Sequence, residues 1–349
     1  MKNKIILLLY VFTMALNLLA GTLQLKQVDQ WKYNRISLFH FFSLIDKDNQ
    51  LLASFFKSPF LLLSKDKSIE LIRQGEGPSE VLDAQAVFLF KEPGELAVLE
   101  NPGKLKIFTK KNGTYIGGKI LWLKRGNKAI YIKNGIFFDN KIFLTGLIIE
   151  KKSNTECEVN LLRILDENGN QLKQVIKRNV SLNYQTHLMR VYVVGYKQDG
   201  VFVLRENELK VAVVSSKTLN VVKEVNLEPP PFYKPMPKNF YIFKKYDNPK
   251  ENFLEDIETW AMGYSKINYV LVSGKSLVLQ IRTCKDKMKK FALLFYNAET
   301  FKLENTIFTD DLLLGAKDGK FYFAAGGDPG RDHENDELVI NICTLEAGK

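Results

Sequence analysis

Few residues in this chain could support nucleophilic or metal-dependent hydrolysis. The three histidines are His40, His187 and His333, and the sequence contains no Gly-x-Ser-x-Gly elbow and no His-Glu-x-x-His pair. Those motifs are diagnostic because they expose a nucleophile on a tight turn or place two imidazoles on one helical face. The sequence therefore offers no local motif for either chemistry.

An acidic segment near the C-terminus is a candidate for metal binding. Residues 328–337 contain five carboxylates, and Asp332, Glu334 and Asp336 alternate as in the first half of a calcium loop. Glu337 stands where such a loop needs glycine for its sharp turn, and no bidentate glutamate follows at the required distance. We therefore expect a solvated hairpin loop without a cofactor, with a weak Ca²⁺ site as the alternative.

The three cysteines, Cys157, Cys284 and Cys343, fit no metal-ligand spacing. Buried thiols behave as small apolar side chains, so three free thiols are the simplest expectation. Export would make a disulfide possible. The pairing to test joins Cys284 and Cys343, because both lie in the last two of the repeats described below.

The segment 228–262 is the least generic part of the chain. Its 35 residues include six of the eleven prolines and eight aromatic residues. Prolines stiffen a segment, and aromatic rings provide a large contact area at low entropic cost. The rings either pack down as a structural cap or line a recognition surface on a rigid scaffold. The residues selected for partner binding are Phe232, Tyr233, Tyr241, Tyr246 and Trp260.

β-Strands must position these candidates, because beyond residue 35 the sequence is a series of short apolar runs separated by Gly, Asn, Asp and Lys clusters. No amphipathic helical pattern persists, whereas strands joined by hairpins account for the runs. A polar turn that follows a strand recurs at steps of 45, 57, 49, 81 and 48 residues, and the insertion of 35 residues reduces the long step to 46. The six turns begin at Ser64, Thr109, Asp166, Ser215, Tyr296 and Thr344.

A period of about 45–50 residues built from strands alone is typical of propeller blades. The turns therefore predict an all-β, six-bladed β-propeller with four-stranded antiparallel blades. The sixth turn lies at the C-terminus and leaves no room for the outermost strand of the last blade. Residues 22–28 precede the first blade and alternate as a strand does. We expect this N-terminal strand to close the ring.

One blade resembles a known repeat. The match comprises the turn Gly75-Glu76-Gly77-Pro78-Ser79-Glu80-Val81 and the strands and turns that follow it to Gly113. This stretch resembles the NHL-type repeat of bacterial six-bladed β-propellers, from which Ser79, Val81 and Glu100 depart. The other blades match only in period. The resemblance implies a propeller whose relatives are mostly binding or scaffold proteins, with some enzymes among their structural relatives.

The turn of this repeat also has a physical role of its own. Gly75 and Gly77 permit a positive φ, and Pro78 restricts the next φ. We expect these residues, with Glu80, to form a structural turn that leads the chain from one blade into the next. The segment is a poor phosphate cradle, because it lacks a third glycine and no helix follows it.

The N-terminus has the pattern of a targeting segment. Lys2 and Lys4 precede an apolar stretch, and Ala20 offers a cleavage site. The stretch is shorter than the ~20 residues of a spanning helix. We expect a signal peptide at 1–20 and a propeller at 21–349, exported to the periplasm or the exterior without a transmembrane segment. An uncleaved anchor is the alternative.

The net charge of +11 does not indicate a nucleic-acid partner. The 50 basic residues comprise 41 lysines and 9 arginines, against 39 acidic residues. Recognition of phosphates and base edges relies on the arginine fork, whereas lysine acts as a diffuse point charge. A solvated surface accounts for this composition, and we expect no nucleic-acid partner.

Six blades and the insertion use nearly all of the chain, so no second domain is left for catalysis. We expect a monomeric, non-enzymatic binding or scaffold protein that presents loops to a protein, peptide or glycan. The alternative is a propeller enzyme of the lyase or lactonase type with a metal at the central channel. Three or more carboxylates or histidines at the channel would favour the enzyme.

Overall fold

The computed structural model describes residues 23–34, 40–46, 48–55, 60–65, 67–75, 77, 79–82, 84–91, 94–100, 103–112, 114–123, 129–151, 156–181, 190–197, 199–236, 263–284, 290–326 and 337–347. The predicted signal peptide at 1–20 lies outside these residues and stays a prediction. Within the described ranges, no helix is long and apolar enough to cross a membrane.

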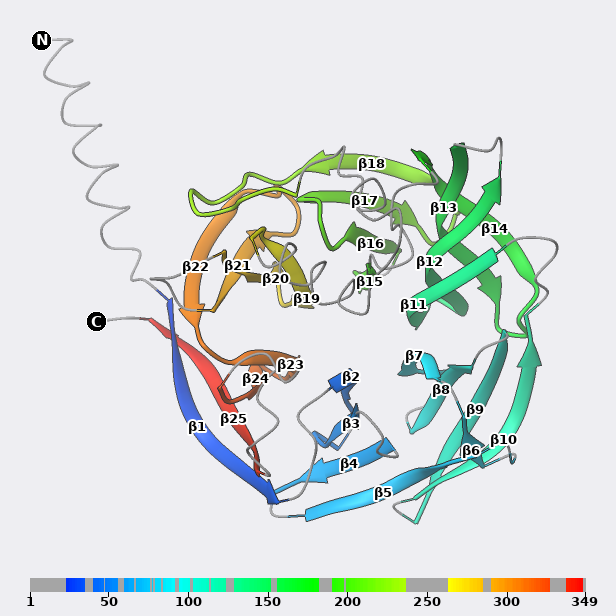
Figure 1. Cartoon of the computed structure of the whole chain (residues 1–349), viewed down its shortest axis with the longest axis horizontal. Helices are drawn as coiled ribbons and strands as arrows, with labels where there is room; N and C mark the ends of the chain where they lie inside the picture. Colours follow the sequence, from blue (N-terminus) through cyan, green and yellow to red (C-terminus); the bar gives the residue numbers. More distant parts are fainter. Residues whose placement is uncertain are drawn as a thin grey trace, which may run out of the picture.

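The described strands form a ring of six antiparallel sheets (Figure 1). Blade 1 contains β2 (His40–Ile45), β3 (Leu51–Phe55), β4 (Phe60–Ser64) and β5 (Lys67–Gln74), with the short β6 (Glu80–Val81) parallel to β5. Blade 2 contains β7 (Ala84–Leu89), β8 (Glu95–Glu100), β9 (Lys104–Lys111) and β10 (Thr114–Trp122). Blade 3 contains β11 (Ala129–Phe138), β12 (Lys141–Lys151), β13 (Glu156–Asp166) and β14 (Gln171–Ser181).

The second half of the chain repeats the same arrangement. Blade 4 contains β15 (Val191–Tyr196), β16 (Gly200–Arg205), β17 (Lys210–Ser215) and β18 (Val221–Asn226). Blade 5 contains β19 (Lys266–Ser273), β20 (Ser276–Arg282), β21 (Phe291–Asn297) and β22 (Leu303–Thr309). Blade 6 contains β23 (Leu312–Lys317), β24 (Lys320–Ala324), β25 (Glu337–Ala347) and β1 (Leu23–Asn34). The prediction of a six-bladed β-propeller is confirmed.

Strand β1 closes the ring, as the sequence predicts. It pairs antiparallel with β25, from Leu23 opposite Ala347 to Asn34 opposite Glu337, so the two ends of the described chain lie side by side (Figure 1). The strand is longer than the predicted 22–28. Its additional part carries Tyr33, which is buried and whose hydroxyl donates to the carbonyl oxygen of Ser64 in blade 1.

The apolar core lies between the blades rather than at the ring axis. Each junction between neighbouring blades contains one cluster of buried apolar side chains. Strand β8 is almost wholly buried because neighbouring blades cover both of its faces, which explains its continuous apolar run. The outer strand β18 is largely exposed, and three of its six residues are polar, Lys223, Glu224 and Asn226. A side chain such as Phe108, fully buried between blades 1 and 2, contributes about 1.5–3 kcal/mol to stability.

The strand directions divide the propeller into two faces. The hairpin face carries the turns between the first and second and between the third and fourth strands of a blade, such as 139–140 and 167–170. Five of the six predicted turns are third-to-fourth-strand hairpins, and the sixth lies where β25 ends beside the start of β1. The opposite connection face carries the links from second to third strands and from blade to blade, such as 75–82, 206–209 and 227–236.

Polar contacts on the hairpin face also link neighbouring blades. Ser216 Oγ in blade 4 donates to Asp139 Oδ2 in blade 3, at 2.6 Å. Lys110 Nζ in blade 2 lies 2.7 Å from the buried carboxylate of Asp46 in blade 1. Similar ion pairs join Lys91 with Glu167 and Lys197 with Glu299.

The suggested bridge between Cys284 and Cys343 is wrong, because both thiols are free. Cys343 in β25 is buried against the junction of blades 5 and 6, close to the hairpin face, where it pairs with Phe321. Cys284 follows β20 at the connection face. The two residues therefore lie toward opposite ends of the propeller. The side chain of Cys157 lies outside the described part.

Candidate functional site

The six innermost strands offer no carboxylate to the central channel. Strands β2, β7, β11, β15, β19 and β23 follow one another around the ring (Figure 1). Along their lengths they contain no aspartate or glutamate and one histidine, His40 at the start of β2. No group of three or more His, Cys, Asp or Glu side chains able to hold a metal occurs among the described residues. Carboxylate ligands for a lyase or lactonase metal would therefore have to come from connecting loops.

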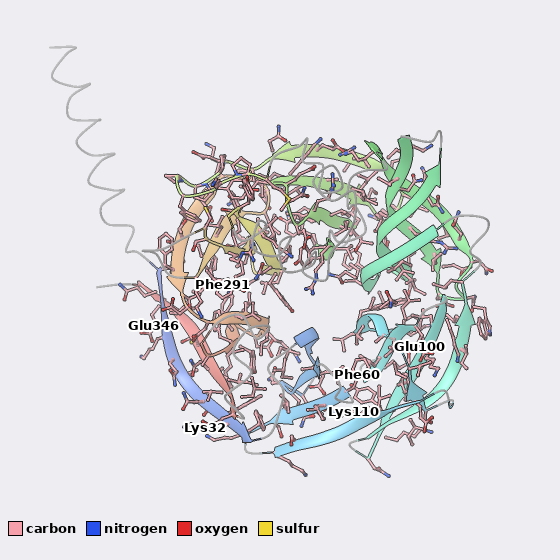
Figure 2. The ribbon with its side chains drawn as sticks, viewed as in Figure 1. Lys32, Phe60, Glu100, Lys110, Phe291 and Glu346 are labelled. Carbon is pink, nitrogen blue, oxygen red and sulfur yellow. The ribbon has the colours of Figure 1, made fainter. Side chains whose placement is uncertain are left out.

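The connection face is the richer candidate, and the turn between blades 1 and 2 lies on it. This turn surrounds Lys106 on β9, whose side chain is 1% exposed. Lys106 Nζ donates to the carbonyl oxygens of Gly77, at 3.0 Å, and of Glu80. It also lies 3.1 Å from Glu100 Oε2, and Glu100 Oε1 accepts the backbone N–H of Leu82. Figure 2 places Glu100 on the blade-2 side of the ring.

The carboxylate of Glu80 completes the same turn. Glu80 Oε2 accepts the backbone N–H of Gly77 at 2.9 Å. A Cβ atom at Gly75 would lie 2.2 Å from that oxygen, so any side chain at Gly75 would displace the carboxylate from Gly77. Close approach, rather than a left-handed backbone, requires glycine at Gly75. Pro78 lies outside the described residues.

The described part of the predicted insertion, 228–236, lies beside residues 227 and 263–265, and we term residues 227–236 and 263–265 the insertion stem. Its two arms are clamped together, because Ser265 N donates to Lys234 O at 2.8 Å and Lys234 N donates to Ser265 Oγ at 3.0 Å. The buried Tyr296 of blade 5 donates its hydroxyl to Glu228 O at 2.7 Å. The stem is thereby tied to itself and to blade 5.

Phe232 and Tyr233 are half-buried in this stem. Both pack against the apolar cluster between blades 4 and 5. The Phe232 ring contacts Phe308 on β22, with 5.2 Å between centroids, and burial raises the pKa of Tyr233 to about 12. The two rings thus serve partly as a cap without being fully covered.

The surface formed by the stem and the adjacent end of β22 combines aromatic and cationic groups. Phe308 is 40% exposed, and the exposed Lys234 holds its Nζ 5.0 Å from the ring centroid of Tyr264. An ammonium over an aromatic face is favourable and orders both side chains. Prolines at 229–231 and 235 stiffen the backbone around them.

The remaining predicted site residues lie outside the described part of the chain. Tyr241, Tyr246 and Trp260 belong to 237–262, and Asp332, Glu334 and Asp336 belong to 327–336. The strands on either side of each segment have their adjoining ends at the connection face. The aromatic and the acidic segments, far apart in sequence, are therefore attached to the same face as the turn at 75–82.

The structure also reveals an exposed tryptophan that the sequence reasoning missed. Trp122, the last residue of β10, is 67% exposed, and Lys104 Nζ lies 5.8 Å from its ring centroid. Its neighbours Leu121 and Leu123 are buried between blades 2 and 3. Strand alternation between these two leucines would have predicted the exposure.

Comparison with known proteins supports the fold and no more. No protein-family model and no curated protein matches the chain. A solved member of the DUF4221 family from Bacteroides vulgatus is similar, with a TM-score of 0.60 and 10% identity over 94% of this chain and 100% of that one. A candidate exported protein from Bacteroides fragilis is similar with a TM-score of 0.57 and 13% identity, over 94% and 96% of the two chains. This chain shares the six-bladed propeller arrangement of these proteins, and the NHL-type resemblance stays an expectation.

Proposed function

We propose that this protein is an exported, monomeric, non-enzymatic binding propeller whose connection face recognises a polypeptide over the insertion stem. The observation that supports this most is the pair of hydrogen bonds between Lys234 and Ser265, one between backbone groups and one from the Lys234 N–H to the Ser265 hydroxyl. They fix the base of an aromatic, proline-rich insertion on a rigid blade. Rigid presentation lowers the entropic cost of binding, which is how loops on a scaffold gain affinity.

The composition of the stem favours a polypeptide over a glycan. The stem exposes Lys234, three of its prolines and its one carboxylate, that of Glu228, whereas its aromatic rings are half-buried. Polypeptide interfaces are enriched in aromatic side chains and methionine at their centres, and Met236 adds to this character. A sugar would need several convergent hydrogen-bonding side chains for its hydroxyl groups. The described stem provides few of these.

Two observations support export. Residues 1–20 have the pattern of a signal peptide. One similar solved structure is that of a candidate exported protein. A partner on the cell surface, in the periplasm or in the medium would be accessible from such a location.

Phe308 provides the direct test of the proposed surface. The exported protein and its Phe308→Ala variant are used to capture polypeptides from the envelope and culture medium of the producing cells, with quantification by mass spectrometry. A glycan array is probed in parallel with the same samples. Val222→Ala is the matched control, because Val222 is 61% exposed on the outer strand β18, outside the stem.

We expect a polypeptide whose capture falls at least tenfold with Phe308→Ala and is unchanged with Val222→Ala, since central aromatic residues dominate binding energy. Equal capture by both variants would place the partner elsewhere. Glycan binding that depends on Phe308 would replace the polypeptide with a sugar.

A further inference from the structure

The outer strands of blades 2 and 3 differ in charge from the rest of the perimeter. The fourth strand of each blade lies on the perimeter of the ring, and these strands are β5, β10, β14, β18, β22 and β1 (Figure 1). Four of the six contain an acidic residue, Asp29, Glu70, Glu224 or Glu304. Strands β10 and β14 contain none, and their basic residues are Lys119, Lys173, Lys177 and Arg178. We term β10 and β14 the basic wall.

The basic wall also exposes large apolar side chains. Ile116 and Trp122 on β10 are 47% and 67% exposed, and Leu172 on β14 is 46% exposed. They are three of the eight large apolar side chains that are exposed in the described part of the chain. Leu121 and Leu123, on either side of Trp122, are buried between blades 2 and 3. Strand alternation therefore holds the indole on the outside.

The two strands of the basic wall meet at the hairpin that precedes β14. Lys119 Nζ donates to Asn168 Oδ1 in this hairpin, at 3.2 Å. A Cβ atom at Gly169 would lie 3.4 Å from Leu121 Cβ, so the hairpin packs directly against the end of β10. The end of β10 and the start of β14 therefore form one continuous surface on the convex perimeter (Figure 1).

Two carboxylates close to the basic wall are already paired with cations. Glu167, in the hairpin before β14, lies 2.8 Å from Lys91. Glu224, on the neighbouring strand β18, lies 2.7 Å from Arg178. Neither carboxylate lies on the wall itself. The basic wall therefore carries an excess of positive charge.

We propose that the basic wall docks the protein on the surface of an anionic lipid bilayer. Protein interfaces are depleted in lysine, whereas the bilayer interface favours tryptophan together with basic residues. Trp122 would lie at the level of the lipid headgroups, with the Lys104 ammonium 5.8 Å from its ring centroid. Ile116 and Leu172 would add apolar contact, and Lys119 would attract anionic headgroups. A convex surface suits a bilayer, because it offers no concavity for a small ligand. This proposal does not depend on the stem surface.

Flotation with lipid vesicles tests the basic wall. The exported protein should bind mixed phosphatidylglycerol–phosphatidylcholine vesicles about tenfold more tightly than pure phosphatidylcholine vesicles, and high salt should release it. Trp122→Ala should weaken binding about tenfold, and Lys119→Gln about fivefold. Val222→Ala on β18 and Lys302→Gln in blade 5 are the matched controls, since both side chains are exposed away from the wall. Both controls should bind as the wild type does.

Tryptophan fluorescence gives a second measurement that depends on the contact itself. Mixed vesicles that include a brominated phosphatidylcholine should quench part of the emission of the wild type. Most of this quenching should be lost in Trp122→Ala, because Trp31 is buried between blades 6 and 1.

Three outcomes would overturn the proposal. The first is equal binding to both kinds of vesicle. The second is unchanged vesicle binding by Trp122→Ala and Lys119→Gln, each shown to be folded by its melting temperature, which would assign binding to another part of the chain. The third is a captured polypeptide that is lost with Trp122→Ala when no vesicle is bound, which would replace the bilayer with a protein. Phe308→Ala should retain vesicle binding, so failure here and failure of the stem surface can be distinguished.

Discussion

Lys106 and Glu100 form a buried ion pair, with 3.1 Å between Nζ and Oε2, at the entrance to the second blade. The same ammonium donates to the carbonyl oxygens of Gly77 and Glu80, so three acceptors surround it. Glu100 in turn accepts the N–H of Leu82. The pair therefore holds three described residues of the turn from blade 1 to blade 2, Gly77, Glu80 and Leu82.

Replacing Lys106 with methionine should destabilise the protein strongly. The variant would keep a side chain of similar length but remove the closer cation of the buried Glu100, and breaking a buried ion pair costs about 3–5 kcal/mol in the free energy of unfolding. Lys104 Nζ, 3.6 Å from the same carboxylate, would remain, so we expect a loss toward the lower end of this range. Urea denaturation measures this loss. Lys302→Met, at an exposed lysine, is the control and should change stability by less than about 0.5 kcal/mol. A similarly small loss for Lys106→Met would show that the turn does not depend on the pair.

The ring itself could be predicted from sequence because its signals are local. Turns such as those at Thr109 and Asp166 recur at blade spacing, and each joins strands that are adjacent along the chain. The closing strand from Leu23 was also predictable, since an outer strand was missing at one terminus and a spare strand stood at the other. The pattern of hairpin turns and the length of the repeat are sufficient to predict such features.

Features that depend on distant contacts could not be predicted. Lys106 is buried because it meets acceptors 26 and 29 residues earlier in the chain, whereas lysine in a strand ordinarily indicates a solvent face. The left-handed backbone of Ile176 in β14 also has no sequence signal. Cys284 and Cys343 lie in neighbouring repeats, but the repeat pattern does not show whether a residue lies toward the hairpin face or toward the connection face.

Trp31 should be essential for ring closure. It is 6% exposed, and its ring packs edge-on against Tyr322 with 5.6 Å between centroids. Trp31→Ala would open a cavity in the apolar cluster between blades 6 and 1, with an expected loss of about 3–5 kcal/mol in urea denaturation. The adjacent Lys32, exposed on the outer surface (Figure 2), supplies the control Lys32→Ala, which should be near neutral. Equal stability of the two variants would mean that closure does not rely on this ring.

The contact between Ser216 and Asp139 should produce a pH-dependent contribution to stability. The hydrogen bond from Ser216 is the largest cause that lowers the pKa of Asp139 below its ordinary value of 3.8. A carboxyl group with a lowered folded-state pKa contributes stability that is present above the ordinary value and is lost as the pH falls through the folded-state pKa. Ser216→Ala should therefore cost about 1 kcal/mol at pH 7 and progressively less below pH ~4.

Urea denaturation of wild type and Ser216→Ala across this pH range measures the difference. Thr218→Ala in the same turn is the control, because the Thr218 side chain is exposed. A Ser216→Ala deficit that stays constant from neutral to acid pH would assign the loss to packing rather than to the charge of Asp139.

The free thiols should differ in reactivity. Burial, with a smaller contribution from the charge of Asp311, raises the pKa of Cys343 to about 11, so at pH 8 it is a buried thiol with very little thiolate. Because the thiolate is the nucleophile, Cys343 in the folded protein should resist iodoacetamide while Cys284, which is half-buried at the connection face, is modified first. Peptide mapping by mass spectrometry follows each site, and unfolding in urea should make Cys343 reactive. Modification of native Cys343 at the unfolded rate, or a peptide linking it to Cys284 without reductant, would contradict its placement in the junction of blades 5 and 6.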